Sequence, residues 1–364
     1  MTFDKTLSPK GFSTFSGLEK KILVAPLNWG LGHATRCIPI IKALLKNGFM
    51  PIIASDGDAL LLLKKEFPQL PFYELPAYNI IYSKGKNQKL KLFLQSKKII
   101  KAAKEEQLTI GRIHKKEKLS GIIADNRFGV RLKELPSVYI THQINVLSGS
   151  ATNISSAIHQ KIMRKFSVCW VPDYTSDFKL SGKLSAITSR KLNIEYIGAL
   201  SRFKKKKVPK HYEILILLSG PEPQRSLLET KLLNEFKYYD KKVLLVRGIF
   251  TTDSLKTNNK NIEVKNHLLT KDLENAINSS KLILCRSGYS TILDMAKLQK
   301  KVFFIPTPGQ YEQEYLAAHL QRHKIAPYAT QAKFFIDKLS QTRNFKGFSG
   351  FKEQPFSPHL FKIF

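Results

Sequence analysis

The chain has 364 residues, 43% of them hydrophobic and 24% charged, which suffices for two domains with sizeable cores and excludes a collagen-like or wholly disordered protein. Lys and Arg number 60 against 28 Asp and Glu, and the net charge of +32 favours a polyanionic partner: a nucleic acid, an anionic membrane surface or a phosphorylated ligand. Three isolated cysteines argue against a zinc ribbon or a disulfide framework, and no apolar run reaches the ~18–20 residues of a membrane span. We therefore expect a cytoplasmic protein, with any membrane contact peripheral on the inner face of the cell membrane.

The first half of the chain alternates strand and helix patterns. Residues 1–19 lack the apolar core of a signal peptide, and we expect them to form a loose leader. From residue 20 an apolar strand, a Gly-rich turn, a helix that ends near Gly48 and a second strand form a βαβ unit. Strands are predicted at 22–25, 51–54, 121–124, 137–140, 168–171 and 194–197. Residues 20–201 are therefore predicted to form one α/β domain with a doubly wound parallel sheet.

A basic linker at 202–211, with four consecutive lysines, separates this half from a second α/β pattern. Strands are predicted there at 213–218, 243–246, 281–284 and 302–305, which makes 212–340 a second domain. Two such domains enclose a cleft, and ligands of doubly wound folds bind beyond the carboxyl ends of the strands. Residues 341–364 contain six Phe and little periodicity, and we expect an aromatic, basic C-terminal tail of undefined structure.

The first motif that carries chemistry is the Gly-rich turn that ends in His33. Gly30 and Gly32 let the backbone turn tightly after a strand, and the helix that follows begins at the histidine. The positive end of a helix disfavours an imidazolium, so His33 is kept neutral and available as a base. The alternative is a structural βα turn with an incidental histidine.

Two further motifs follow strands of the second half. Residues 286–294 place small hydroxyl side chains at the start of a helix, where N–H groups can hold a diphosphate, and Asp294 follows one turn later, where it can accept hydrogen bonds from ribose hydroxyls. The alternative is ordinary capping by Ser and Thr with a solvated Asp. Residues 303–314 run from a strand through a Pro/Gly loop into a helix, at the same sheet edge.

In this order and separation, the motifs resemble those of the MurG-like glycosyltransferases of family 28, over about residues 20–335. The family's strand-end HEQN resembles 141–145, its interdomain GNPVR resembles 198–202, its donor signature resembles 286–294 and its proline loop with Gln-Gln resembles 306–314. The resemblance implies the GT-B fold, in which two Rossmann-like domains face across a cleft. The chain departs from the family where 218–222 replaces a Gly-Gly-Ser turn, and where Asp294, Glu314 and Ala317 replace Glu, Gln and Asn.

The resemblance implies an inverting, metal-independent glycosyltransferase that moves a sugar, of N-acetylglucosamine type, from a UDP-sugar to a hydroxyl acceptor. His33 would be the general base, and Asp125, directly after a predicted strand, would orient it; the alternative is a structural Asp in the turn. The expected donor-binding residues, with Leu268 beside the uracil, are Arg202, Ser219, Gly220, Leu268, Arg286, Ser287, Gly288, Tyr289, Ser290, Thr291, Asp294, Gln310, Gln313 and Glu314. The expected acceptor-binding residues are Asn28, Trp29, Gly30, Gly32, Asn126, Arg127, His142 and Gln143. The acceptor is expected to be a glycan or glycolipid, with no cofactor and no metal ligands.

Two alternatives stay open. Residues 32–37 also resemble the GHxxRC motif of UDP-sugar hydrolases, which share the fold and activate water with the histidine, so a hydrolase or epimerase-like enzyme is the second hypothesis. Residues 84–118 form a basic segment in which Leu90, Phe93, Leu94, Ile100 and Ala103 recur at helical spacing. This pattern predicts an amphipathic helix for an anionic membrane surface, or only a solvated helix face. Nucleic-acid binding is not expected, because the sequence lacks an RNP motif or a helix-turn-helix signature.

Overall fold

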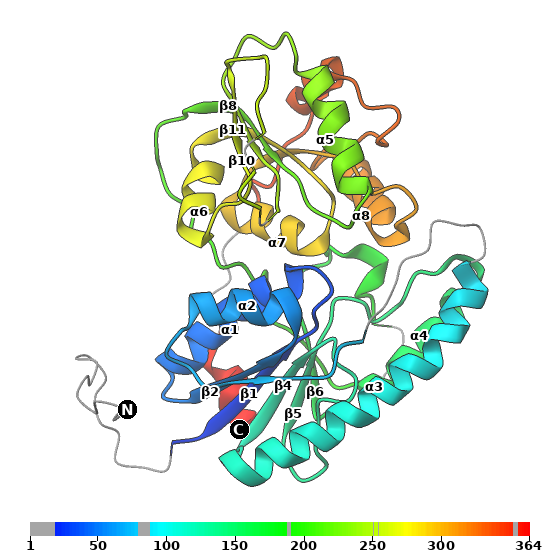
Figure 1. The fold of residues 1–364 in the computed structure, drawn as a ribbon. Coiled ribbons are helices and arrows are strands. Elements are labelled where there is room, and N and C mark those ends of the chain that lie inside the picture. The colour runs from blue at the N-terminus through cyan, green and yellow to red at the C-terminus, as the bar shows by residue number, and fades with distance from the viewer. Residues whose placement is uncertain (1–18, 79–87, 188–190, 250, 254, 352–355) are drawn as a thin grey trace, which may run out of the picture.

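The computed structural model describes residues 19–78, 88–187, 191–249, 251–253, 255–351 and 356–364, although not the side chains of 88–97 and 150. These residues form two domains, one above the other in Figure 1, each built on a parallel sheet flanked by helices. The predicted architecture of two parallel-sheet α/β domains is confirmed. The expected leader lies outside the described residues, except Glu19.

The N-terminal domain contains a seven-stranded sheet in the order β3-β2-β1-β4-β5-β6-β7, and all its pairs are parallel. Its strands are β1 (Lys21–Pro26), β2 (Met50–Ser55), β3 (Phe72–Glu74), β4 (Gly121–Asp125), β5 (Ser137–Ile140), β6 (Val168–Val171) and β7 (Ile194–Tyr196). Its helices are α1 (Gly32–Lys46), α2 (Gly57–Glu66), α3 (Gln88–Glu117) and α4 (Thr152–Met163), with short 3-10 turns at Gly149–Ala151 and Gly182–Leu184.

The C-terminal domain contains a five-stranded parallel sheet in the order β10-β9-β8-β11-β12. Its strands are β8 (Tyr212–Leu217), β9 (Val243–Val246), β10 (Ile262–Lys265), β11 (Ser280–Cys285) and β12 (Lys301–Phe304). Its helices are α5 (Gln224–Glu235), α6 (Thr270–Asn278), α7 (Tyr289–Leu298) and α8 (Tyr311–Arg322), followed by 3-10 segments at Ile336–Asn344 and Pro358–Ile363.

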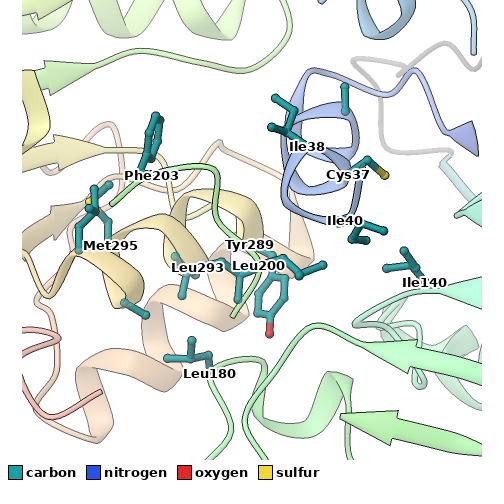
Figure 2. Packing of buried hydrophobic residues seen from close by; sticks show 14 of the residues in the cluster. Cys37, Ile38, Ile40, Ile140, Leu180, Leu200, Phe203, Tyr289, Leu293 and Met295 are labelled. Atoms are coloured by element: carbon teal, nitrogen blue, oxygen red, sulfur yellow. The ribbon is translucent and has the colours of Figure 1, made fainter. Parts of the chain in front are cut away.

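The two domains share one apolar core across their interface. Figure 2 shows Ile38 and Ile40 of α1, Leu200 just before the linker, Phe203 within it, and Tyr289 of α7 in a single buried cluster. Because apolar area buried between the domains is removed from water, this seam stabilises the closed arrangement. It also brings the amino ends of α1 and α7 together at the carboxyl edges of both sheets.

The basic segment forms the long helix α3, as its spacing predicts, and the residues that α3 buries are not those of the predicted apolar face. Ala102, Ile110 and Ile113 are buried, whereas Ile100 is 57% exposed. The side chains of residues 90, 93 and 94 lie outside the described part of the chain.

The C-terminal segment is not a free tail. It leaves the C-terminal domain and ends beneath the N-terminal sheet, where Figure 1 draws the chain end beside β1 and β4. Phe361 is 4% exposed, and its ring lies 5.6 Å from that of Phe49 and 6.2 Å from that of Trp170. Lys20 donates to the carbonyl oxygen of Phe364 at 2.7 Å. The last residues thus belong to the core of the first domain.

We expect Phe361→Ala to lower the free energy of unfolding by about 3–5 kcal/mol, because it empties a buried aromatic site between Phe49 and Trp170. Phe335→Ala, in which the truncated ring is 54% exposed, is the matched control and is expected to cost about 0.5 kcal/mol or less. Urea unfolding of both variants measures the difference. Equal midpoints would show that the segment contributes no packing energy.

Candidate active site

The first Gly-rich turn places His33 at the amino end of α1, beyond the carboxyl end of β1. Gly30 has a φ of +72°, a left-handed value that favours glycine. Gly32 is required by a different constraint, since a Cβ there would lie 2.8 Å from Oγ of Ser290 in the other domain. The turn is therefore shaped by its own backbone and by the opposing domain.

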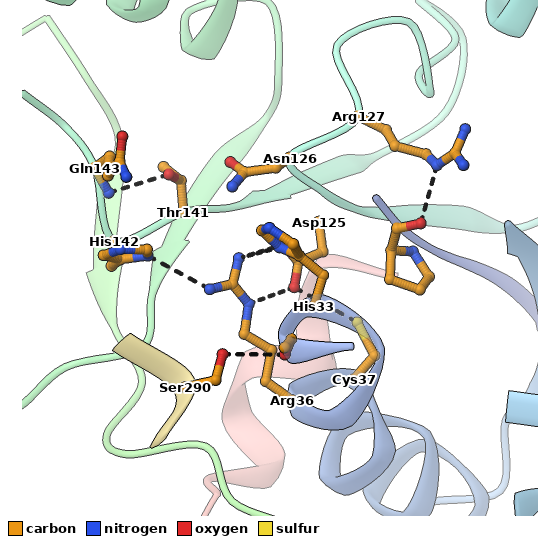
Figure 3. A network of polar contacts seen from close by, with 12 residues as sticks. His33, Arg36, Cys37, Asp125, Asn126, Arg127, Thr141, His142, Gln143 and Ser290 are labelled. Carbon is orange, nitrogen blue, oxygen red and sulfur yellow. Dashed lines mark hydrogen bonds and ion pairs between the residues drawn. The ribbon is translucent and has the colours of Figure 1, made fainter. Parts of the chain in front are cut away.

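His33 contacts a buried ion pair (Figure 3). Its Nδ1 lies 2.7 Å from Oδ1 of Asp125, the last residue of β4. Arg36, one turn along α1, donates its Nε to Asp125 Oδ2 at 2.5 Å and its Nη2 to Oδ1. Although burial opposes ionisation, Arg36 and His33 lower the pKa of Asp125 to about 2. The carboxylate is therefore ionised throughout the neutral pH range.

Nδ1 of His33 faces two groups: Asp125 Oδ1, an acceptor, at 2.7 Å and Arg36 Nη2, a donor, at 2.8 Å. The tautomer with the proton on Nδ1 donates to the carboxylate and leaves the lone pair on Nε2. None of the described residues hydrogen-bonds Nε2, and the side chain is 13% exposed. Burial lowers the pKa of His33 and Arg36 lowers it further, against the opposing effect of Asp125. The result is a neutral imidazole with a free basic nitrogen, suited to a general base.

Arg36 and Cys37 were expected only as part of the GHxxRC resemblance, with no role of their own. The available signal was spacing, because residues i and i+3 share a helix face, which puts Arg36 beside His33. The thiol of Cys37 also points at Asp125, with 3.7 Å between Sγ and Oδ2, and burial raises its pKa far above the usual value. Three side chains of α1, those of His33, Arg36 and Cys37, thus surround one carboxylate.

The second motif meets this turn from the other domain. Ser290, in the first turn of α7, donates to the carbonyl oxygen of Gly32 at 3.1 Å. Tyr289 is buried, donates its hydroxyl to the Pro172 carbonyl at 2.8 Å and stacks on His142 with ring centroids 4.0 Å apart. Gly288 caps the helix, and Thr291 is half-buried beside it. Of the expected donor-binding residues, Tyr289 and Ser290 thus use their side chains for contacts between the two domains.

The proline loop is held by the side chains that follow it. Gln313 Oε1 accepts from the Thr307 backbone at 2.9 Å, and its Nε2 donates to Gln310 Oε1 at 2.8 Å. Glu314 Oε1 accepts from the Gly309 backbone at 3.0 Å. Ser287 donates to the carbonyl of Gln313 at 2.7 Å, which ties the second motif to the third.

His142 and Gln143, expected at the acceptor, face the C-terminal domain instead. His142 Nε2 lies 2.7 Å from Oε1 of Glu312, and Gln143 Nε2 donates to Oε2 of the same carboxylate. Glu312 is the second residue of α8 and was assigned no role from sequence. Both expected acceptor side chains are therefore occupied by an interdomain contact.

The linker end of the site joins Arg202, Ser201 and Asp294. Ser201 donates to Asp294 Oδ1 at 2.5 Å, and Arg202 Nη1 donates to Thr270 Oγ1 at 3.0 Å. Burial raises the pKa of Asp294 to about 7, although Ser201 and Arg202 oppose this shift. Leu268 packs partly buried against the shared core.

At the end of β8, Ser219 and Gly220 are exposed, and Gly220 has a φ of +102°. Their backbone is therefore accessible at the carboxyl edge of the C-terminal sheet. Trp29 is 44% exposed beside the His33 turn, and Asn126, with a φ of +56°, accepts from Tyr139 at 3.1 Å.

Three expected ligand-binding side chains lie elsewhere. Arg127 is fully buried and its guanidinium is taken up by Asp56, Glu106 and two carbonyls, so Figure 3 shows it turned away from His33. Arg286 is 1% exposed and donates to the carbonyls of residues 305, 306 and 224 and to Gln331. Asn28 bonds Asp56 and the amide of residue 59. The expectations for Arg127, Arg286 and the side chain of Asn28 are corrected: these groups are structural because they are held by other parts of the protein, although Nε of Arg286 has no hydrogen-bond partner among the described residues.

Within the described residues, His, Cys, Asp and Glu side chains form no group of three that is placed to hold a metal ion. The described helices also include none that is both long and apolar enough to cross a membrane.

Comparison with known proteins places this geometry in context. Residues 220–344 match the model of the glycosyltransferase family 28 C-terminal domain. The chain is 20% identical over 332 residues, 88% of both chains, to the UDP-N-acetylglucosamine–N-acetylmuramyl-(pentapeptide) pyrophosphoryl-undecaprenol N-acetylglucosamine transferase of Haemophilus ducreyi. It is 24% identical over 213 residues, 57% of this chain and 56% of the relative, to the corresponding transferase of Buchnera aphidicola.

Solved structures share the two-domain fold. The MurG structure of Acinetobacter baumannii superposes with a TM-score of 0.58 at 16% identity, covering 95% of this chain and 99% of that one. The spinosyn rhamnosyltransferase SpnG gives a TM-score of 0.64 at 12% identity, covering 90% and 93%. The expected GT-B fold is confirmed.

Proposed function

We propose that this chain, a MurG-like glycosyltransferase of family 28 with the GT-B fold, transfers an N-acetylglucosamine-type sugar from UDP to an acceptor hydroxyl with inversion. The observation that carries the proposal is the His33–Asp125 pair, which lies at the carboxyl edge of one sheet and directly opposite the amino end of α7 in the other domain. The names of the curated relatives support UDP-N-acetylglucosamine as the donor.

The base acts in one displacement. Nε2 of His33 takes the proton of the acceptor hydroxyl as its oxygen bonds to the anomeric carbon, and the bond from that carbon to the UDP oxygen breaks with its electron pair on the diphosphate. Asp125 accepts the Nδ1 proton in a hydrogen bond and stabilises the imidazolium that forms. Attack opposite the leaving group inverts the anomeric configuration.

The leaving diphosphate needs positive groups to stabilise its charge, and the chain offers such groups without a metal ion. The amide groups at the start of α7, around Ser287 to Thr291, carry the positive end of the helix dipole. The guanidinium of Arg202 and the exposed backbone of Ser219 and Gly220 extend this surface. Fixed dipoles of this kind stabilise developing phosphate charge because they need no reorganisation.

The remaining contacts with the donor would be made at the carboxyl edge of the C-terminal sheet. Asp294 would exchange its bond to Ser201 for the ribose hydroxyls, with the uracil beside Leu268, and the amides of Gln310 and Gln313 border the sugar. The acceptor would approach from the N-terminal side, past the exposed Trp29 and Asn126, and is a glycan or a lipid-linked sugar. Closure of the domains excludes water, which favours transfer over hydrolysis.

A UDP-sugar hydrolase is the second candidate. Arg36 and Cys37, which follow the Gly-His turn as in GHxxRC, both contact Asp125, so the whole motif contributes to the base. The same Nε2 would then deprotonate water in place of an acceptor hydroxyl.

Peripheral contact with an anionic membrane on the cytoplasmic side is supported by two surface features. Ile154 and Ile158 of α4 are 68% and 59% exposed one turn apart, and Lys98, Lys101 and Lys104 of α3 are exposed. Both helices contribute to the same core cluster on one face of the N-terminal sheet. Apolar side chains with basic neighbours suit the interface of an anionic bilayer.

His33→Ala is expected to lower turnover by ~10²–10⁴-fold with little change in UDP affinity, because it removes the base from the domain that does not hold the donor. The assay follows sugar transfer and UDP release together, and the control is His359→Ala, an exposed histidine. Unchanged turnover in His33→Ala would contradict the proposal that His33 is the general base. UDP release at the full rate without acceptor, lost in the same variant, would establish the hydrolase.

Asp294→Ala is expected to weaken UDP binding roughly ten-fold or more, since the loss of one or two hydrogen bonds costs ~1–3 kcal/mol. Calorimetry with UDP measures it, with Asp272→Ala, an exposed aspartate of α6, as control. Equal affinity for UDP in both variants would remove Asp294 from the donor site.

Replacing Lys98, Lys101 and Lys104 by Glu is expected to weaken binding to phosphatidylserine vesicles by about ten-fold or more, because each surface Lys contributes ~1 kcal/mol. The matched control replaces the exposed Lys237, Lys241 and Lys242 of the C-terminal domain, which changes the net charge equally. If both triple variants sediment alike with the vesicles, α3 presents only a solvated face.

A further inference from the structure

Glu312 reaches from the C-terminal domain into the network around the base. Its Oε1 lies 2.7 Å from His142 Nε2, and its Oε2 accepts from Gln143 Nε2, so both carboxylate oxygens are engaged by the N-terminal domain. The side chain is 32% exposed and sits in the first turn of α8, where the helix dipole favours a negative charge. Although burial opposes ionisation, His142 lowers the pKa of Glu312.

A continuous chain of contacts leads from Glu312 to His33. Arg36 Nη1 lies 3.4 Å from Nδ1 of His142, its Nε and Nη2 donate to Asp125, and Asp125 Oδ1 accepts the Nδ1 proton of His33. One proton assignment satisfies the His142 contacts: Nε2–H donates to Glu312, and the lone pair of Nδ1 accepts from Arg36. Stacking on Tyr289 keeps the His142 ring in this orientation.

We propose that Glu312 is a positioning residue for His33, acting across the domain interface through His142 and Arg36, so that the base is correctly set only when the two domains are closed. The role of His33 as base rests on the proposed function. Glu312 does not touch the reacting atoms. It holds His142 in place, and His142 in turn holds Arg36. When the domains are open, His33 would not be correctly positioned as a base. A donor bound to the open enzyme would therefore be hydrolysed more slowly.

The charges around His33 give this proposal a measurable signature. The groups that face it are Asp125 at the end of β4, Arg36 and Cys37 on α1, His142 after β5, and Glu312 on α8. Arg36 lowers the pKa of His33, and the negative charge of Glu312 partly offsets that effect. Removal of the Glu312 charge therefore lowers the pKa of His33 further. A purely structural contact would not move this pKa.

The test is an NMR titration of the histidine ring resonances in the full chain, labelled at histidine, with and without saturating UDP. His33→Gln assigns the His33 resonance. Glu312→Gln is expected to lower the pKa of His33 by about 0.5 unit or more, since a charge within this range shifts a buried group by that order. Glu312→Asp keeps the charge and is expected to restore most of the shift.

The matched control is Glu66→Gln. Glu66, at the end of α2, accepts from Thr270 of the other domain and pairs with Arg202, so this variant also loses an interdomain carboxylate, but these partners do not include His142, Arg36 or Asp125. Its His33 titration is expected to match that of the parent. In the enzyme assay, the acidic limb of kcat/KM is expected to move to lower pH in Glu312→Gln, while UDP affinity stays within about two-fold.

An unchanged His33 titration in folded Glu312→Gln overturns the proposal. Equal shifts in Glu312→Gln and Glu66→Gln overturn it too, because both would then report only a loosened interface. The titration needs neither donor sugar nor acceptor. If sugar transfer fails with every acceptor while the His33 shift appears, the proposed function falls and the link from Glu312 to His33 stands.

Discussion

The negative charge of Asp125 is the constraint around which the site is arranged. A carboxylate that is fully buried is tolerated only if it is paired and hydrogen-bonded, because the loss of its hydration costs several kcal/mol. Arg36 supplies the positive charge that pairs with the Asp125 carboxylate, and His33 and Cys37 make further contacts with it. All three come from the first turns of α1, so the position of that helix against β4 is set by electrostatics as well as by packing.

The domain interface combines two kinds of contact with different demands. The apolar part, with Tyr289 near its centre, is non-directional and tolerates small displacements. The polar part, in which Ser290 meets Gly32 and Glu312 meets His142, is directional and exists in one geometry only. The first holds the domains together, and the second specifies how they are aligned.

Local pattern was sufficient for most of the fold and for the pairing of His33 with Asp125. The buried strands are continuous apolar runs, and β1 and β4 are neighbours, so residues beyond their carboxyl ends meet. The strands β3 and β10 were not predicted, because both are short edge strands with partly exposed, mixed sequences.

The misassigned arginines illustrate a different limit. Arg286 occupies a motif position and Arg127 follows a strand end, so both look like ligand-binding groups in sequence. Their partners are mainly backbone carbonyls and distant carboxylates that no local pattern reveals. The contact between Glu312 and His142 spans 170 positions and two domains. It depends on how the domains are placed, which periodicity does not encode.

The return of the C-terminal segment to the first domain sets an order of assembly. Phe361 fills space between Phe49 and Trp170, and Lys20 donates to the carbonyl oxygen of Phe364, so the N-terminal domain receives part of its core from residues that follow the second domain in the sequence. The N-terminal domain therefore cannot cover this apolar surface beneath its sheet until the second domain and the segment after it have been synthesised. The two domains are therefore completed together, although their sheets are formed from separate stretches of the chain.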